Sequence, residues 1–255
     1  MGTRNMEAID ILAFGAHPDD VELTCAGLLI KMGRMGYRTG VVDLTRGEMG
    51  TRGTPETRRA EADAAAQVMG LAVRENLGLP DGHIQADTDQ KQKVVGAIRK
   101  YRPSLLALPY REDPHPDHQN ASRLIFESSY LSGLEKYRPE HGAAHRPEKL
   151  IYYPGRPGFY ETRPSFIVDV SDVFEQRLKA IECYRSQLYD EGSRERPTEI
   201  SSRDYLDRII ATARYYGVLA GVKYGEPYFC REIIRVNDPM AQFIRGVSGD
   251  MRNAE

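Results

Sequence analysis

The sequence predicts a single α/β domain, residues 1–255, in which helices flank a mostly parallel sheet. Short apolar runs of strand length alternate with segments whose apolar residues recur at helical spacing. Such alternation implies βαβ units with parallel strands and right-handed crossovers. A chain of 255 residues can bury a substantial core as one domain, and we find no internal repeat, low-complexity tract or linker that would divide it.

The first half of the chain carries the clearest pattern. Strands are predicted at 9–14, 38–45, 73–77 and 105–108. Helices are predicted at 21–35, 56–69, 90–101 and 119–131. Gly70 and Pro103 are placed to end the second and third helices, and Pro116 suits the first turn of the fourth.

The second half is less regular. Residues 132–163 are rich in Gly, Pro and Tyr, with one strand expected at 149–153. A further strand is expected at 165–170, helices at 172–188 and 201–219, and an edge strand at 228–236. The last residues are expected to be frayed, and the segment after about residue 190 receives no functional role.

Composition excludes several classes of function. The net charge is −2 and the Lys and Arg residues are scattered, so we expect neither a nucleic-acid partner nor a membrane surface. Cys25, Cys183 and Cys230 form no CxxC pair, which argues against a disulfide framework or a cysteine metal site. No apolar run approaches membrane-spanning length and no signal peptide is visible, so the cytoplasm is the default expectation.

The first motif is His17-Pro18-Asp19-Asp20, in the turn between the first predicted strand and helix. Pro18 disfavours a helical conformation for His17 and keeps it extended at the tip of the strand. Either aspartate is suited to ligate a cation or to face its bound water. The same residues also suit a helix cap with a spare aspartate, because such caps are common.

The second motif is His115-Pro116-Asp117-His118, after the fourth predicted strand. Ligands of open α/β sheets bind beyond the carboxyl ends of the strands, where both motifs lie. His17, Asp20 and His118 would give a cation two nitrogens and one carboxylate and leave a fourth position for water. A proline-rich surface turn is the alternative interpretation of this motif alone.

Polar residues outside the proposed ligand set have sequence patterns that are less specific for a function. Asp117 is suited to hold His115 in one tautomer and to raise its pKa. Arg58 opens the second helix after a Gly-rich loop, where it would be either a solvated charge or a contact for an anionic substrate. The remaining histidines lie in loops without carboxylates and are expected to be exposed rather than ligands: His83, His141 and His145.

These motifs resemble the PIG-L/LmbE-like family of zinc-dependent N-deacetylases, which have a Rossmann-like fold. Residues 17–22 match its AHPDDxE signature together with Ala16, and residues 115–118 match its HPDH motif. The likeness runs from about Ile9 to Gln187. It is greatest for the bacterial branch that deacetylates N-acetylglucosaminyl-malate in bacillithiol biosynthesis, as segments 14–16, 42–45, 50–54 and 76–81 indicate.

The resemblance implies a role for each motif residue. His17, Asp20 and His118 would bind Zn²⁺, or Fe²⁺, which suits the same ligands. Asp19 would be the general base, and His115, oriented by Asp117, would stabilise the oxyanion and protonate the leaving amine. Arg58 would contact the substrate. The expected reaction releases acetate from a small N-acetylglucosamine conjugate, and the branch often forms homo-oligomers, including hexamers.

Three alternatives remain open on the sequence. The substrate could be another N-acetylglucosamine conjugate or a chitooligosaccharide, since sister enzymes differ in this respect. A metal-dependent phosphoesterase often pairs two metals, whereas the motifs offer ligands for one. A non-catalytic nucleotide-binding module would need Gly-x-Gly-x-x-Gly after the first strand, but no glycine lies between Gly15 and Gly27.

Overall fold

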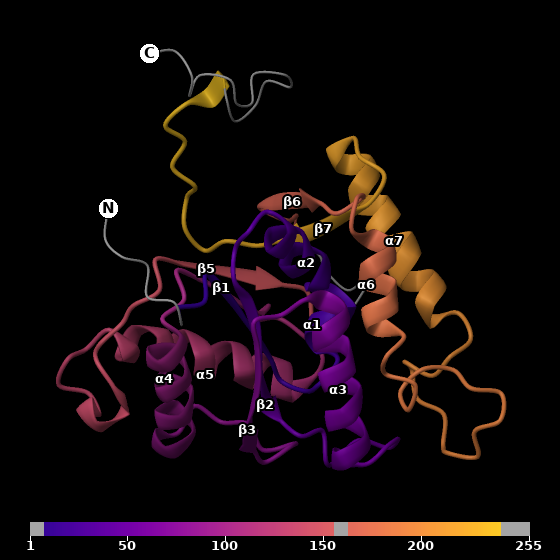
Figure 1. Ribbon diagram of the computed structural model, residues 1–255, viewed down its shortest axis with the longest axis horizontal. Helices are drawn as coiled ribbons and strands as arrows, with labels where there is room; N and C mark the ends of the chain where they lie inside the picture. Colours follow the sequence, from indigo (N-terminus) through magenta and orange to yellow (C-terminus); the bar gives the residue numbers. More distant parts are fainter. Residues whose placement is uncertain (1–7, 156–162, 241–255) are drawn as a thin grey trace.

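The computed structural model describes residues 8–155 and 163–240, and its centre is a five-stranded parallel sheet (Figure 1). The strand order is β3-β2-β1-β4-β5, and every neighbouring pair is parallel. The strands are β1 (Ile11–Gly15), β2 (Thr39–Thr45), β3 (Val73–Leu79), β4 (Leu105–Pro109) and β5 (Lys149–Tyr153). The predicted mostly parallel sheet with flanking helices is confirmed.

The neighbouring strands β1 and β4 are apolar throughout, as expected where both faces of a sheet are covered. Side chains alternate along β1: Leu12 and Phe14 join the core cluster under α4 (Thr88–Tyr101) and α5 (Pro116–Ser132). Ile11 and Ala13 join the opposite cluster, under α2 (Ala26–Arg34) and α6 (Phe174–Ile181). No helix in the two described ranges is long and apolar enough to cross a membrane.

The predicted helix at 21–35 is two helices. α1 (Asp20–Thr24) ends at Cys25, whose φ of −131° leaves the helical region before α2 begins. α3 (Pro55–Met69) lies where it was predicted, with Gly70 in the left-handed conformation after it. The Thr54 side chain accepts a hydrogen bond from the backbone N–H of Thr57 at 3.2 Å and so caps this helix.

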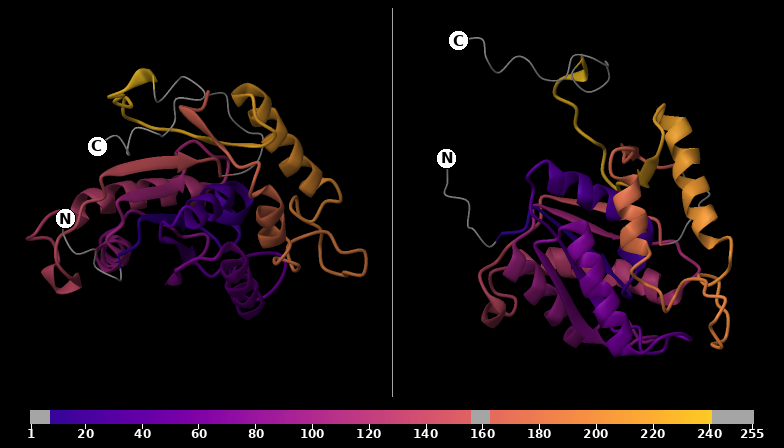
Figure 2. Two further views of the ribbon diagram at one scale, coloured as in Figure 1. Left: turned by 45° about the horizontal axis from the view of Figure 1, so that its top comes forward. Right: turned by 45° about the vertical axis from the view of Figure 1, so that its right-hand side comes forward.

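The second half adds a layer beside α2 and α3 (Figure 2). The layer contains α6, α7 (Tyr205–Ala220) and an antiparallel pair, β6 (Phe166–Asp169) and β7 (Gly225–Tyr228). A short 3₁₀ helix, η1 (Pro139–His141), lies elsewhere and contacts α4. The helix expected at 172–188 is shorter than predicted. The edge strand expected at 228–236 is wrong, because pairing with β6 ends at Tyr228 and residues 231–236 are exposed. The chain end expected to be frayed, 241–255, lies outside the described residues.

Glu226 ties this added layer to the first helices. Its carboxylate accepts hydrogen bonds from the backbone N–H groups of Gly27 and Leu28, both at 2.8 Å, at the start of α2. Arg177 of α6 lies 3.3 Å from the same carboxylate, and Glu226 is only 1% exposed. A buried anion at a helix N-terminus satisfies backbone donors and the helix dipole together.

We therefore expect Glu226→Ala to lower the free energy of unfolding by about 3–5 kcal/mol, because it leaves Arg177 and two backbone donors buried without their anion. Denaturant titration measures the change. The control is Glu140→Ala, since Glu140 is exposed and pairs with Arg138 only at 3.6 Å. Equal, small effects of the two substitutions would contradict this role of Glu226.

Candidate metal centre and active site

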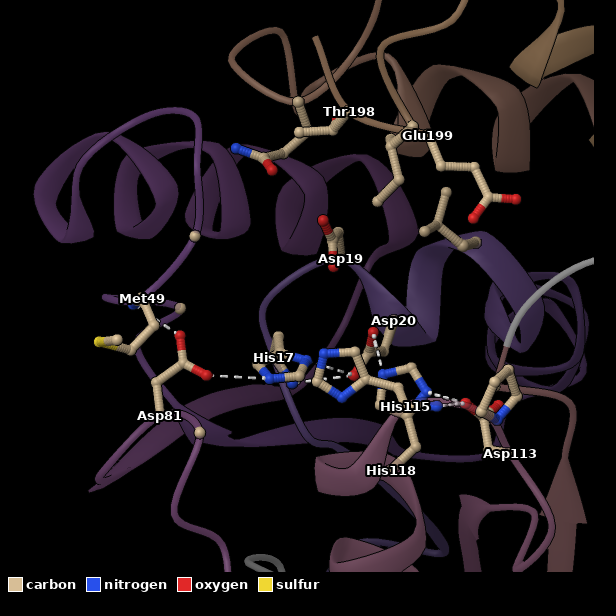
Figure 3. A pocket seen from close by; sticks show the side chains of 18 of the residues that line it. His17, Asp19, Asp20, Met49, Asp81, Asp113, His115, His118, Thr198 and Glu199 are labelled. Carbon is tan, nitrogen blue, oxygen red and sulfur yellow. Dashed lines mark hydrogen bonds and ion pairs between the residues drawn. The ribbon is translucent and has the colours of Figure 1, made fainter. Parts of the chain in front are cut away.

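The two sequence motifs meet because β1 and β4 are neighbours. Their register pairs Ile11 with Leu105 and Ala13 with Ala107, so both strands end at the same rim of the sheet. The helix α1 begins at Asp20, the last residue of the first motif, and α5 begins at Pro116 within the second. A cavity of about 530 Å³ opens at this rim, and Figure 3 shows the motif side chains gathered in it.

His17, Asp20 and His118 form a group of three ligands. One ligand atom from each lies within 4.8 Å of the other two. Nδ1 of His17 is 3.5 Å from Asp20 Oδ2, and Nε2 of His118 is 3.3 Å from Asp20 Oδ1. The side chains are 7–11% exposed, so the group is shielded yet reachable from the cavity. The structure brings together the three ligands predicted from the sequence.

Two carboxylates from outside the motifs, with no role predicted from the sequence, contact the far side of each imidazole. Asp113 Oδ1 lies 3.1 Å from Nδ1 of His118, and Asp81 Oδ1 lies 3.1 Å from Nε2 of His17. Outer carboxylates of this kind fix the ring orientation of metal-binding histidines. A signal was present in the sequence: Asp81 follows β3 and Asp113 follows β4, at the same rim.

Asp117 contacts His17 and not the ring that was expected. Its Oδ2 lies 3.4 Å from Nε2 of His17 and accepts a hydrogen bond from the backbone N–H of Gly82 at 2.7 Å. His17, Asp81 and Asp117 thus form a second ligand group that overlaps the first through His17. The two motifs alone indicate ligands for one metal. Because His17 is shared and Asp117 is held by backbone donors, we interpret this group as the support of the His17 ring.

Nδ1 of His115 accepts a hydrogen bond from the backbone N–H of Asp117 at 3.2 Å, whereas the Asp117 carboxylate contacts His17. The His115 ring stacks on that of His118, with 4.7 Å between centroids. Burial, then the charges of His118 and His17, lower the pKa of His115. This direction is opposite to the expected one, because burial and the two imidazole charges outweigh Asp117, which still raises the pKa of His115.

The carboxylates of this site favour positively charged partners. Burial alone would lower the pKa of His118, but Asp20 and Asp113 outweigh it and raise the pKa to about 10. The pKa of His17 is likewise raised well above its usual value, against burial, by Asp117, Asp20 and Asp81. A divalent cation bound by neutral imidazoles would supply the charge that these protons otherwise carry. The donor set therefore fits a metal ion.

Asp19 lies apart from the ligand group, in the unusual left-handed region with a φ of 116°. It is 4% exposed and lines the same cavity. Burial raises the pKa of Asp19 to about 7, and Arg58 opposes the rise. A strained backbone at such a position is typical of functional sites. The structure thus gives the two adjacent aspartates different surroundings.

Arg58 is not a solvated charge, because it is buried, yet it lines the cavity. It is 5% exposed, and its Nη2 donates to Asp19 Oδ2 at 2.9 Å and to the carbonyl of Pro18. Its Nη1 donates to Oε1 of Gln187 at 3.2 Å. Contact with an anionic substrate was one expectation from the sequence, but the positive charge is committed to Asp19.

The remaining signature residue and histidines lie outside the ligand groups of the described chain. Glu22 is fully buried and pairs with Arg74, which also holds Asp43 at 2.9 Å. His83 is exposed as expected, whereas His141 and His145 are half-buried. Nε2 of His145 lies 2.8 Å from the carbonyl of Pro103.

Comparison with known proteins supports a common origin for this arrangement. The family model described as "PIG-L: GlcNAc-PI de-N-acetylase" matches residues 12–129, which include both motifs. The solved structure of a conserved protein of Thermus thermophilus, TT1542, is 38% identical with a TM-score of 0.80. The match covers 90% of this chain and 98% of that one.

The curated relatives are named for different activities. A diacetylchitobiose deacetylase of Thermococcus kodakarensis is 29% identical, over 85% of this chain and 80% of that protein. A 4-oxalmesaconate hydratase of Pseudomonas putida is 26% identical, over 81% and 82%. A Bacillus cereus protein named "Probable N-acetyl-alpha-D-glucosaminyl L-malate deacetylase 2" is 25% identical, over 69% and 83%.

The fold and the site define an α/β protein with a His/Asp ligand group at the rim of its parallel sheet. With the matches to the family model and to the relatives, they show that the chain belongs to the PIG-L family.

We expect added Zn²⁺ to stabilise the purified protein, because a ligand that binds only the folded state at 100 times its Kd contributes about 2.7 kcal/mol. Thermal unfolding with and without the ion measures this. His118→Ala should abolish the gain, whereas the control His83→Ala should keep it, since His83 is exposed and outside the ligand groups. A full zinc-dependent gain in His118→Ala would contradict the assignment.

Proposed function

We propose that this protein is a metal-dependent deacetylase that hydrolyses the acetamide of an N-acetylglucosamine conjugate and releases acetate. One observation carries the proposal: the ligand group, the separate carboxylate of Asp19 and the ring of His115 line a single cavity. A ligand group, a base and a proton donor are the parts that metal-assisted amide hydrolysis needs.

His17, Asp20 and His118 would hold the cation, Zn²⁺ or Fe²⁺. When bound, such a cation polarises an amide carbonyl and lowers the pKa of water. Asp81, Asp117 and Asp113 would keep the two imidazoles turned toward it, since they contact the opposite ring nitrogens.

Asp19 would take the proton of the attacking water. A general base works best when its pKa is near the working pH, and the burial of Asp19 raises its pKa to about 7. Arg58 keeps this carboxylate in one place and favours its charged form. In this proposal Arg58 positions the base and does not bind the substrate.

His115 would give a proton to the leaving amine. Its Nδ1 accepts a hydrogen bond from the backbone of Asp117, so the neutral ring carries its proton on Nε2, from which it can donate a hydrogen bond to the oxyanion. Proton transfer to the amine requires the imidazolium, which forms when Nδ1 takes a proton and gives up the hydrogen bond from Asp117. His115 lines the cavity at its exposed edge, where a leaving amine would depart. Asp117 would thus act on His115 through its backbone and on His17 through its carboxylate.

The finer assignments from the sequence remain proposals. The motifs favour N-acetylglucosaminyl-malate and bacillithiol biosynthesis, and one relative carries a matching name. Other relatives are named for diacetylchitobiose or for a hydration reaction, so the aglycone must be decided on this chain's own residues. A cytoplasmic homo-oligomer, such as a hexamer, stays a prediction.

The direct test is acetate release from N-acetylglucosamine conjugates by the metal-loaded protein, compared with Asp19→Asn. We expect the variant to retain its metal and to lose about 10²–10⁴ in rate, as removal of a general base typically does. Asp63→Asn on the exposed face of α3 is the control and should act like the wild type. No acetate from the wild type, or near-normal turnover in Asp19→Asn, would refute the corresponding assignment.

A second test separates the two roles of Arg58. Asp19 works as a carboxylate, so activity rises with pH through its pKa. Arg58→Met removes the charge that lowers this pKa, and the acidic limb of the rate profile should move to higher pH by about 1–3. The neighbouring, exposed Arg59 gives the control Arg59→Met. If the acidic limb of the Arg58→Met profile does not move, and only the activity toward anionic substrates falls, Arg58 instead binds the substrate.

A further inference from the structure

A wall of the cavity comes from a segment that carries neither motif. Thr198, Glu199 and Ile200 lie in the connection between α6 and α7, and Tyr205 begins α7. All four line the same cavity as His17 and Asp20. Figure 3 shows Thr198 and Glu199 across the cavity from His115, with Asp19 between them.

This wall is built onto the core of the protein. Tyr205 is buried in an apolar cluster with Leu23 of α1 and Ile181 of α6, and Ile200 packs against that cluster. Thr198 and Ser201 close a turn around Glu199, since the backbone N–H of Thr198 donates to Ser201 Oγ at 2.7 Å. The wall therefore has a fixed position relative to α1, where the metal ligand Asp20 lies.

The charge of the cavity is negative. Among the described lining residues, five are carboxylates, three are histidines and one is an arginine, Arg58, which is committed to Asp19. The imidazoles are neutral when they bind a metal ion. A divalent cation and Arg58 together would supply three positive charges, fewer than the carboxylates carry. Glu199 is the carboxylate of the wall, and its side chain is 55% exposed.

We propose that the wall 198–205 determines which group may be attached to the sugar, and that Glu199 selects against a carboxylate there. The inference rests on the proposed function and narrows it to neutral or cationic conjugates. Like charges disfavour a wrong partner, while apolar side chains such as Ile200 and Tyr205 suit the face of a sugar ring. Arg208 lies 3.6 Å from Glu199, so we expect a moderate discrimination.

The test compares two conjugates, neutral diacetylchitobiose and anionic N-acetylglucosaminyl-malate, using the full-length, metal-loaded protein. The readout is the ratio of their kcat/KM values. We expect the wild type to prefer the neutral sugar, and Glu199→Lys to move the ratio toward the anionic one by roughly 5–50-fold, mainly through KM. The change should shrink at high salt, because exposed charges are screened.

Glu191→Lys is the matched control, because Glu191 lies in the same connection, is exposed, pairs with Arg203 and does not line the cavity. It should leave the ratio unchanged. A wild type that prefers the malate conjugate, or an unchanged ratio in Glu199→Lys, would overturn the inference. If neither sugar releases acetate, the proposed function fails. Calorimetry then measures the Kd of each sugar, and the ratio of the two Kd values tests the inference about Glu199 separately.

Discussion

Buried negative charge at one rim of the sheet is the constraint on which the site depends. Five carboxylates are buried there: Asp19, Asp20, Asp81, Asp113 and Asp117. Ionised groups can be buried only when other charges or hydrogen bonds compensate them. Arg58 compensates Asp19, backbone N–H groups compensate Asp117, and two imidazoles share the others. A cation between His17, Asp20 and His118 would complete this compensation.

The same principle explains charged residues beneath the site. Glu22 belongs to the signature but lies away from the cavity, where Arg74 binds it together with Asp43. Glu226 acts similarly at the start of α2, with Arg177. These buried pairs join elements distant in sequence, so the turn that carries His17 is fixed by β2, β3, α6 and β7 together. The motif is positioned by its surroundings rather than by its own residues alone.

The two halves of the chain contribute differently. The part matched by the family model, residues 12–129, supplies the sheet rim, the ligand group and the buried carboxylate of Asp19. The later part supplies Gln187, which holds Arg58, and the wall that includes Glu199. The ligand group and the wall therefore lie in different parts of the chain, although both line one cavity.

The sequence alone determined the parallel sheet and the ligand group, because strand and helix periodicity and the two local motifs are properties of neighbouring residues. Asp81 and Asp113 became partners of the histidines only when β3, β1 and β4 were placed side by side. The tertiary structure also decided that Asp117 faces His17 and that Arg58 belongs to Asp19. Which carboxylate meets which cation depends on burial and on distances across the fold, and local sequence encodes neither.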